Sequence, residues 1–291
     1  MLFLTESHIR SLLPMAEAIR ILRETFAALA VGQAQNQARR RLVLPSGSVL
    51  HSLAGAAGSY FGTKIYSTHP KHGANFFFLL FDAATAKPLA MMEANYLGQI
   101  RTGAATGAAT DLLAAPEART LGVIGSGFQA RTQIEAISHV RRLSEVRVWG
   151  RDETRRSQFA EGCAAAFRLP VEASGSAERA VRDASIVVTA TSAKDPVLES
   201  AWIANGTLVN AVGSNNPQRR ELPADLIERA DRIVVDSIEQ SRLESGDLLL
   251  AWDERGWSTP RLMELQEAAA KPPSWRADTV TIFKSNGLGV E

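Results

Sequence analysis

The chain has 291 residues, of which 45% are apolar and 22% charged, and its formal net charge is +1. These values are typical of a globular protein with one large or two ordinary domains, and they give no electrostatic reason to expect nucleic acid or a membrane surface as a partner. The single cysteine, Cys163, excludes an internal disulfide framework. Without a signal-peptide pattern or a long apolar run, we expect a cytoplasmic protein.

The first third of the chain predicts two helices followed by a sheet. Thr5 can cap a short first helix, and an apolar face over 16–31 predicts a longer second one. Apolar runs separated by Pro, Gly and Asn then predict a mixed or antiparallel sheet. Its strands are expected at 41–44, 49–53, 60–66 and 76–81, with a short further one at 91–93.

Basic residues in this predicted sheet are the first candidates for a site. Arg39, Arg40 and Arg41 lie together at the start of a strand. Lys64 lies inside an otherwise apolar strand, where it either snorkels from a sheet edge or projects into a pocket and holds a carboxylate. A helix rich in Ala, Thr and Gly over 95–115 follows, and Arg101 lies near its N-terminus, which favours anions.

A glycine turn follows this helix. The apolar run 121–124 leads into Gly125, Ser126 and Gly127, and a helix is expected to begin near Phe128. Ala130 completes a G-x-G-x-x-A pattern, and a second apolar run begins at Val146. Strand, glycine turn and helix start in this order are what the pyrophosphate of a dinucleotide requires. The turn therefore predicts a dinucleotide site.

Short apolar runs alternate with helical patterns from residue 120 to about 238. This alternation predicts a doubly wound parallel sheet, with ligands beyond the carboxyl ends of its strands. Strands are expected at 121–124, 146–149, 171–173, 186–191, 207–212 and 232–236, and a last one at 278–283. The polar residues at the strand ends are either ligand contacts or turn residues: Thr189, Thr191, Asn210, Gly213, Ser214 and Asn215.

The end of the second parallel strand bears on the choice of cofactor. An acidic residue there would bind the ribose of NAD, but this chain has Gly150 followed by Arg151. The Arg151 guanidinium could stack on adenine and pair with a 2′-phosphate. NADP(H) is therefore favoured, while Asp152 leaves NAD(H) open.

Six segments together resemble the ornithine cyclodeaminase/mu-crystallin family over nearly the whole chain. They are 62–66, 80–82, 99–104, 124–129, 210–213 with 220–222, and 282–287. The resemblance implies an α/β fold in which a Rossmann-type doubly wound parallel sheet is inserted into a mixed α+β substrate and dimerisation domain. The expected boundaries are 117–276 for the nucleotide domain and 1–116 with 277–291 for the other, in a homodimer.

The resemblance also implies roles for individual residues, and no metal site is expected. Lys64 and Arg101 are the expected catalytic residues and would contact a substrate carboxylate or its imine. An arginine of the cluster, Arg39 or Arg41, would do the same, and the other expected substrate contacts are Asn215 and Asn286. The expected cofactor contacts are Arg101, Thr102, Gly125, Gly127, Phe128, Gln129, Gly150, Arg151, Thr189, Thr191, Asn210, Ala211, Val212, Arg219 and Ser285.

One departure from the family pattern bears on the reaction. In the cyclodeaminases an aspartate interacts with the substrate amine, whereas this chain has Asn215 at that place, and an amide is no general base. Asp247, the nearest carboxylate downstream, is interpreted as structural. We therefore expect NAD(P)H-dependent hydride transfer to C=N, or from C–NH, of a small imino or amino acid such as Δ1-pyrroline-2-carboxylate. Ornithine cyclodeaminase and a non-catalytic, NADPH-binding crystallin-like protein are the alternatives.

Overall fold

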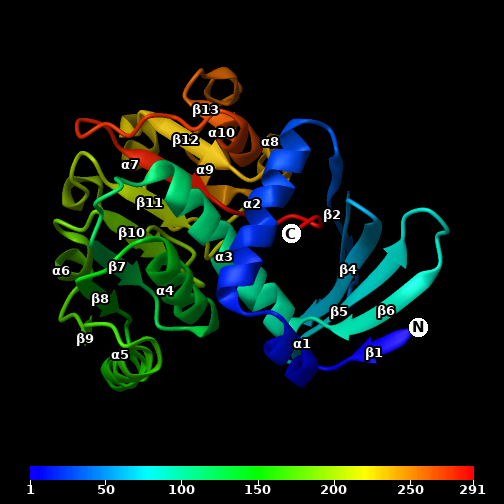
Figure 1. Cartoon of the computed structure of the whole chain (residues 1–291). Helices are drawn as coiled ribbons and strands as arrows, with labels where there is room; N and C mark the ends of the chain where they lie inside the picture. The colour runs from blue at the N-terminus through cyan, green and yellow to red at the C-terminus, as the bar shows by residue number, and fades with distance from the viewer.

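Two β-sheets form the two halves of the molecule, with helices α2 (Met15–Ala30) and α3 (Asn95–Leu113) between them (Figure 1). The structure is a computed structural model, and it describes residues 1–291. The smaller sheet is antiparallel apart from its parallel β1–β6 edge. In spatial order it contains β1 (Leu2–Leu4), β6 (Pro88–Glu93), β5 (Gly73–Asp82), β4 (Tyr60–His69), β3 (Val49–Ala57) and β2 (Ala34–Val43).

Strand β4 lies inside this sheet. Within it, Lys64 pairs with Leu53 of β3 on one side and with Phe78 of β5 on the other. The lysine therefore lies on an interior strand, and its side chain projects from a face of the sheet rather than from its edge.

The larger sheet has eight strands, all of them parallel. The chain runs outward from β7 through β8 to β9, then returns to the other side of β7 with β10, so the strand order reverses between β7 and β10. The predicted doubly wound Rossmann sheet is thus confirmed, with its switch point at this pair. The order is β13 (Leu262–Glu264), β12 (Arg232–Val235), β14 (Thr281–Lys284), β11 (Leu208–Ala211), β10 (Ile186–Thr189), β7 (Thr120–Ile124), β8 (Glu145–Trp149) and β9 (Val171–Ala173).

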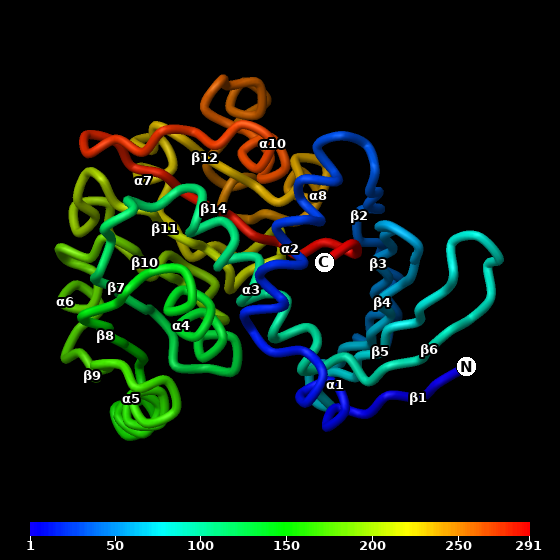
Figure 2. The backbone as a smooth tube through the Cα atoms, viewed as in Figure 1, coloured from blue at the N-terminus to red at the C-terminus, as the bar shows by residue number.

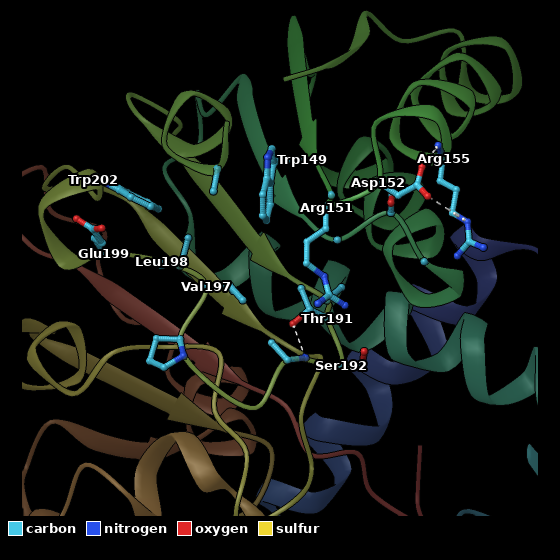
Figure 3. A pocket seen from close by; sticks show the side chains of 18 residues that line it. Trp149, Arg151, Asp152, Arg155, Thr191, Ser192, Val197, Leu198, Glu199 and Trp202 are labelled. Atoms are coloured by element: carbon cyan, nitrogen blue, oxygen red, sulfur yellow. Dashed lines mark hydrogen bonds and ion pairs between the residues drawn. The ribbon is translucent and has the colours of Figure 1, made fainter. Parts of the chain in front are cut away.

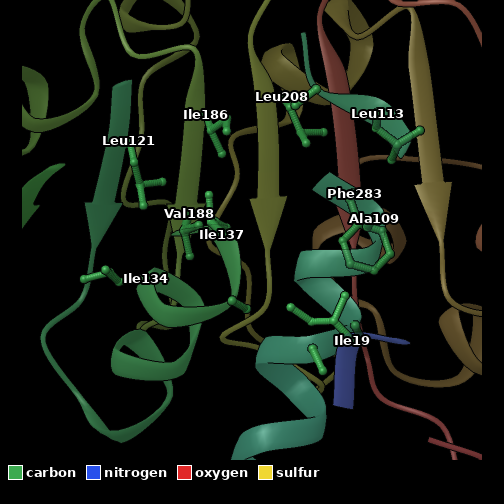
Figure 4. Packing of buried hydrophobic residues seen from close by; sticks show 14 of the residues in the cluster. Ile19, Ala109, Leu113, Leu121, Ile134, Ile137, Ile186, Val188, Leu208 and Phe283 are labelled. Carbon is green, nitrogen blue, oxygen red and sulfur yellow. The ribbon is translucent and has the colours of Figure 1, made fainter. Parts of the chain in front are cut away.

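Alternate residues of these strands feed two hydrophobic cores, one on each face of the sheet. On one face Leu121, Val188 and Phe283 pack against α2, α3 and α4 (Phe128–Val140) (Figure 4). On the other face Val187 and Ile282 pack against shorter helices. The remaining helices are α1 (Glu6–Leu12), α5 (Glu153–Phe167), α6 (Ala177–Val181), α7 (Ala224–Arg229), α8 (Ile238–Glu244), α9 (Gly246–Leu249) and α10 (Leu265–Ala270).

The small-residue face predicted for 95–115 allows α3 to pack closely. A side chain on Gly103 would collide with the backbone of Thr132 in α4, and one on Gly107 would press on Ile19 of α2. Helix α3 is therefore packed tightly between the two halves. Among all the helices, none is both long and apolar enough to cross a membrane.

The last strand, β14, belongs to the parallel sheet and not to the substrate domain. The sequence predicts that 277–291 belong to the substrate domain, but β14 is hydrogen-bonded between β11 and β12 in the middle of the parallel sheet. Only the segment after it returns to the smaller sheet, where the Gly289 amide donates to Asn36 Oδ1 at 2.9 Å. The C-terminal end of the chain accordingly lies between the two halves (Figure 2).

Candidate active site

A cavity of about 590 Å³ opens beyond the carboxyl ends of β7, β8 and β10. Figure 3 shows Trp149 and Arg151 on one side of it and Val197, Leu198 and Trp202 on the other. This is the crevice at the switch point of the sheet, where open α/β folds bind their ligands.

The glycine turn fits a dinucleotide pyrophosphate. Gly125 has φ +121°, a conformation that favours glycine, and any side chain there would collide with the Ala190 carbonyl. A Cβ on Gly127 would have no atom within 4 Å, so the approach to the N-terminus of α4 is open. Bare backbone and the free amides of a 13-residue helix are the groups that bind a pyrophosphate in such folds.

The segment after β8 bears the residues expected to select the cofactor. A side chain on Gly150 would lie 2.6 Å from Ser126 Oγ, so glycine lets this segment approach the turn. Arg151 lines the cavity, whereas Arg156 donates to the Gly150 carbonyl at 2.8 Å. Asp152 also lines the cavity, but its Oδ1 accepts the Arg155 amide at 2.9 Å as the N-cap of α5. Its carboxylate is therefore already used in capping.

A second cavity, of about 520 Å³, lies between the smaller sheet and helices α3 and α4. Its lining contains three basic side chains and no carboxylate. An excess of positive charge in a partly enclosed space suits a small anionic ligand. The lining residues are Arg39, His51, Leu53, Lys64, Tyr66, Thr68, Phe76, Asn95, Gly98, Arg101, Phe128, Gln129, Asn215 and Leu288.

Lys64 projects into this second cavity, which settles the choice left open by the sequence. Its Nζ lies 5.0 Å from the centre of the Phe76 ring and so close to α3 that a Cβ on Gly98 would come within 2.6 Å. No carboxylate forms an ion pair with it. Burial, and then the nearby Arg101 and Arg39, lower the pKa of Lys64 to about 7.

The arginine cluster is organised by one buried carboxylate. Arg39 and Arg41 both form ion pairs with Glu244 of α8, whose side chain is fully buried. Arg39 also donates to the carbonyls of Asn286 at 3.0 Å and Gly287 at 3.1 Å. It is Arg39 that lines the cavity, while Arg41 donates to the Asn215 carbonyl at 3.0 Å.

Arg101 lines the same cavity as Arg39, and both arginines lie beside Gly287. The Arg101 Nη1 is 2.6 Å from Glu291 Oε2, and the Arg101 guanidinium occupies the space that a side chain on Gly287 would fill. Leu288, which follows Gly287, lines the second cavity as well.

The other expected site residues fall into three groups. Thr191 lines the first cavity, and Phe128, Gln129 and Asn215 line the second. Arg219 is exposed and Val212 half-buried, and neither lines a cavity. The rest are buried behind the walls, namely Thr102, Thr189, Asn210, Ala211, Ser285 and Asn286. Among them, the Thr102 hydroxyl donates to the Gly98 carbonyl at 2.7 Å, and the Asn286 amide donates to Ser241 Oγ at 2.9 Å.

Two further residues of the site are not recognisable as site residues from the sequence. His51 lines the second cavity, stacks on Tyr66 with ring centres 4.2 Å apart, and hydrogen-bonds Thr68 Oγ1 at 3.0 Å. Burial, followed by Arg41 and Arg39, lowers the pKa of His51 to about 4, so its ring is neutral at pH 7. Glu221 is fully buried beneath the strand ends, where burial raises its pKa. His51 lies in a segment without a distinctive sequence pattern, whereas Glu221 lies in 220–222, one of the segments that carry the family resemblance. In both cases only tertiary contacts show what the side chain does.

A Rossmann sheet with a cavity at its switch point, and a cationic cavity between this sheet and the smaller one, is an arrangement typical of nicotinamide-dependent oxidoreductases. The chain belongs to the ornithine cyclodeaminase/mu-crystallin family, whose sequence profile matches residues 1–291.

Three known proteins show how close the similarity is. The chain is 37% identical over 215 residues to the Δ1-pyrroline-2-carboxylate reductase of Bacillus cereus, an alignment that covers 73% of this chain and 66% of that protein. The structure of Thermococcus litoralis Δ1-pyrroline-2-carboxylate reductase with NADH and L-proline matches with a TM-score of 0.93 at 30% identity. That match covers 100% of this chain and 93% of the other. An archaeal alanine dehydrogenase dimer with bound NAD matches with a TM-score of 0.89 at 28% identity, over 100% and 92% of the two chains.

Proposed function

We propose that this chain is an NAD(P)H-dependent reductase of small α-imino acids, for which Δ1-pyrroline-2-carboxylate is the model substrate, and that it can run the same step in reverse on an amino acid. The observation that carries this proposal is the second cavity, with three basic side chains, no carboxylate, and a place beside the glycine turn. The two similar solved structures, one with NADH and L-proline and one with NAD, support it.

Substrate binding follows from the cationic walls. Lys64, Arg101 and Arg39 line the same cavity and would hold the carboxylate of a small anionic substrate. Arg39 is fixed by Glu244 and two carbonyls, so little freedom is lost when the substrate binds. A carboxylate held from several sides fixes the adjacent C=N carbon, which favours reaction by orientation. The bound nicotinamide supplies the hydride.

Lys64 is the residue that we expect to supply the proton to the imine nitrogen. With a pKa near 7, its ammonium group is protonated in a large fraction of molecules at neutral pH and gives up its proton readily. Phe76 and Tyr66 keep water from one side of the amine. The chain thus provides both the anion site and the acid that imine reduction requires.

Cyclisation of ornithine fits this cavity less well. That reaction needs a group that accepts the proton of the substrate amine, whereas the lining contains no carboxylate and has the amide of Asn215, which is no base. If the chain is a cyclodeaminase, ornithine yields proline and ammonia with no net change in cofactor. If it only binds cofactor, NADPH binds tightly and no imine is reduced. Incubation with NADPH and Δ1-pyrroline-2-carboxylate, followed at the absorbance of the reduced cofactor, separates a reductase from a protein that only binds cofactor, because the latter consumes no NADPH. Incubation with ornithine and oxidised cofactor, without added imine, identifies a cyclodeaminase by the ammonia that it releases.

The preferred cofactor is proposed to be NADP(H), with Arg151 as the partner of the 2′-phosphate. Replacing Arg151 by Ala should raise the KM for NADPH by roughly tenfold or more, since a charge-assisted hydrogen bond is lost, and should leave the KM for NADH nearly unchanged. Steady-state kinetics with both cofactors measure this. Arg168→Ala, at the far end of α5 and outside the cavity, is the control. Equal increases for NADPH and NADH would contradict the assignment.

A homodimer is proposed to form through the smaller sheet. Its strands expose Leu42, Val43, Leu50 and Phe61, each at least 37% accessible, and such a surface is unusual for a monomer. The dimeric state of the similar archaeal alanine dehydrogenase supports this. Sedimentation at micromolar concentration should give twice the mass of the 31.4 kDa chain, and Leu42→Asp with Val43→Asp should give the monomer.

A further inference from the structure

The buried carboxylate of Glu221 has no part in the proposed imine reduction, yet it connects several strand ends. It accepts four hydrogen bonds: from Thr189 Oγ1 at 3.0 Å, from the Thr191 amide at 2.7 Å, from Thr191 Oγ1 at 2.8 Å, and from the Gly213 amide at 2.7 Å. One of its oxygens bonds both donors of Thr191, and the other bonds Thr189 and Gly213. One side chain thus ties the ends of β10 and β11 together.

The backbone at Glu221 is itself held in place by a second buried carboxylate, that of Asp247. The Glu221 amide and that of Leu222 donate to Asp247 Oδ1, at 2.6 and 2.9 Å. Asp247 pairs at 3.2 Å with Lys284, at the end of β14, and Lys284 donates to the Ser214 carbonyl at 2.5 Å. All these charged side chains are fully buried. The network therefore spans the carboxyl ends of three adjacent parallel strands.

The strand ends that Glu221 holds form part of the wall of the first cavity, the proposed cofactor cavity. Thr191 lines that cavity, and the neighbouring Ala190 carbonyl lies where a side chain on Gly125 would be. A side chain on Gly213 would collide with the Glu221 carboxylate and with the Thr191 backbone, so this packing leaves no spare room. The backbone at 190–191 is thus set between the glycine turn on one side and Glu221 on the other.

We propose that Glu221 is a positioning residue for the bound dinucleotide: its carboxylate fixes the 189–191 and 213 strand ends, and with them the wall against which the cofactor lies. It acts through Thr191 and Gly213 and touches no substrate. This inference rests on the dinucleotide-binding part of the proposed function alone, and holds whichever imine or amino acid is the substrate.

The test is a binding measurement without any imine substrate. Glu221→Gln keeps the shape of the side chain, but its NH₂ group faces donors that need an acceptor. The Kd for NADPH, followed by the emission of the reduced nicotinamide, should rise by about tenfold, the effect of one lost hydrogen bond to a charged group. At saturation the emission per bound NADPH should also fall, because a looser wall leaves the ring more mobile. General destabilisation would not lower this saturated signal.

Two further variants make the result decisive. Thr191→Val removes one donor to Glu221 at nearly constant volume and should shift both readouts in the same direction by a smaller amount. Asp231→Asn alters a carboxylate that accepts the Val280 amide at 2.9 Å at the amino ends of β12 and β14, the opposite end of the strands from Glu221, and should change neither readout. Wild-type affinity and emission in Glu221→Gln, or equal losses in Asp231→Asn, would overturn the proposal. Failure to reduce any imine would count against the proposed function and leave these readouts intact.

Discussion

Replacing Lys64 by Met should lower kcat/KM for imine reduction by roughly a hundred- to ten-thousand-fold, the usual contribution of a positioned general acid. Methionine fills a similar volume between Phe76 and Gly98 but brings neither a charge nor a proton. The Kd for NADPH should stay the same, because Lys64 does not line the cofactor cavity. Steady-state kinetics and a cofactor titration check the two halves of this prediction.

The control is Lys71→Met, on the exposed turn between β4 and β5, which should behave as wild type. The pH profile adds a second check. Because Lys64 must be protonated to act as an acid, kcat/KM should be level below about pH 7 and should fall as pH rises through its pKa of about 7. Lys64→Arg keeps the charge and should lose this fall. An unchanged kcat/KM in Lys64→Met would rule out the assigned role.

Replacing Glu244 by Leu should lower the free energy of unfolding by roughly 3–5 kcal/mol, the cost of leaving a buried charge without its partner. Glu244 is fully buried and is the only carboxylate that pairs with Arg39, whose side chain is 2% exposed. Arg39 would then be held by the two carbonyls alone. Urea denaturation measures the loss, and the KM for the imino acid should rise because Arg39 is no longer fixed.

Glu17→Leu is the matched control for this experiment. Glu17 also pairs with an arginine, Arg20, but both side chains are about half exposed on the surface of α2. Solvent screens such a pair, so unfolding should be nearly unaffected. If Glu17→Leu and Glu244→Leu destabilised the chain equally, the buried pair would not be the organising contact of the arginine cluster.

The sequence predicted those parts of the site that depend on local patterns. The glycine turn is recognisable because strand, turn and helix are consecutive, and Lys64 stands out as a charge in an apolar strand. The features it did not predict depend on pairing between distant segments. Arg39 lines the second cavity whereas Arg41 contacts the Asn215 carbonyl, and no local pattern distinguishes two residues that share one face of a strand.

The same reason explains the misplaced end of the chain. Strand β14 was predicted from its apolar run, but its neighbours, β11 and β12, are some 70 and 50 residues earlier in the chain. Its position inside the Rossmann sheet is thus a non-local property. Strands β1 and β13 were not predicted, and each is a three-residue strand at the edge of its sheet whose pairing partner, β6 or β12, lies elsewhere in the chain. Glu221 likewise lies in a loop, and its role depends on hydrogen bonds from two other segments, at Thr191 and Gly213.

The most direct test of imine reduction follows the hydrogen itself. NADPH carrying two deuterium atoms at C4 of its nicotinamide is incubated with Δ1-pyrroline-2-carboxylate and the protein, and the proline formed is analysed by mass spectrometry. We expect one deuterium atom at C2 of proline for each NADPH oxidised, because the hydride passes to the carbon of the C=N bond. Proline without deuterium, or ornithine converted to proline and ammonia with no NADPH consumed, would contradict the account.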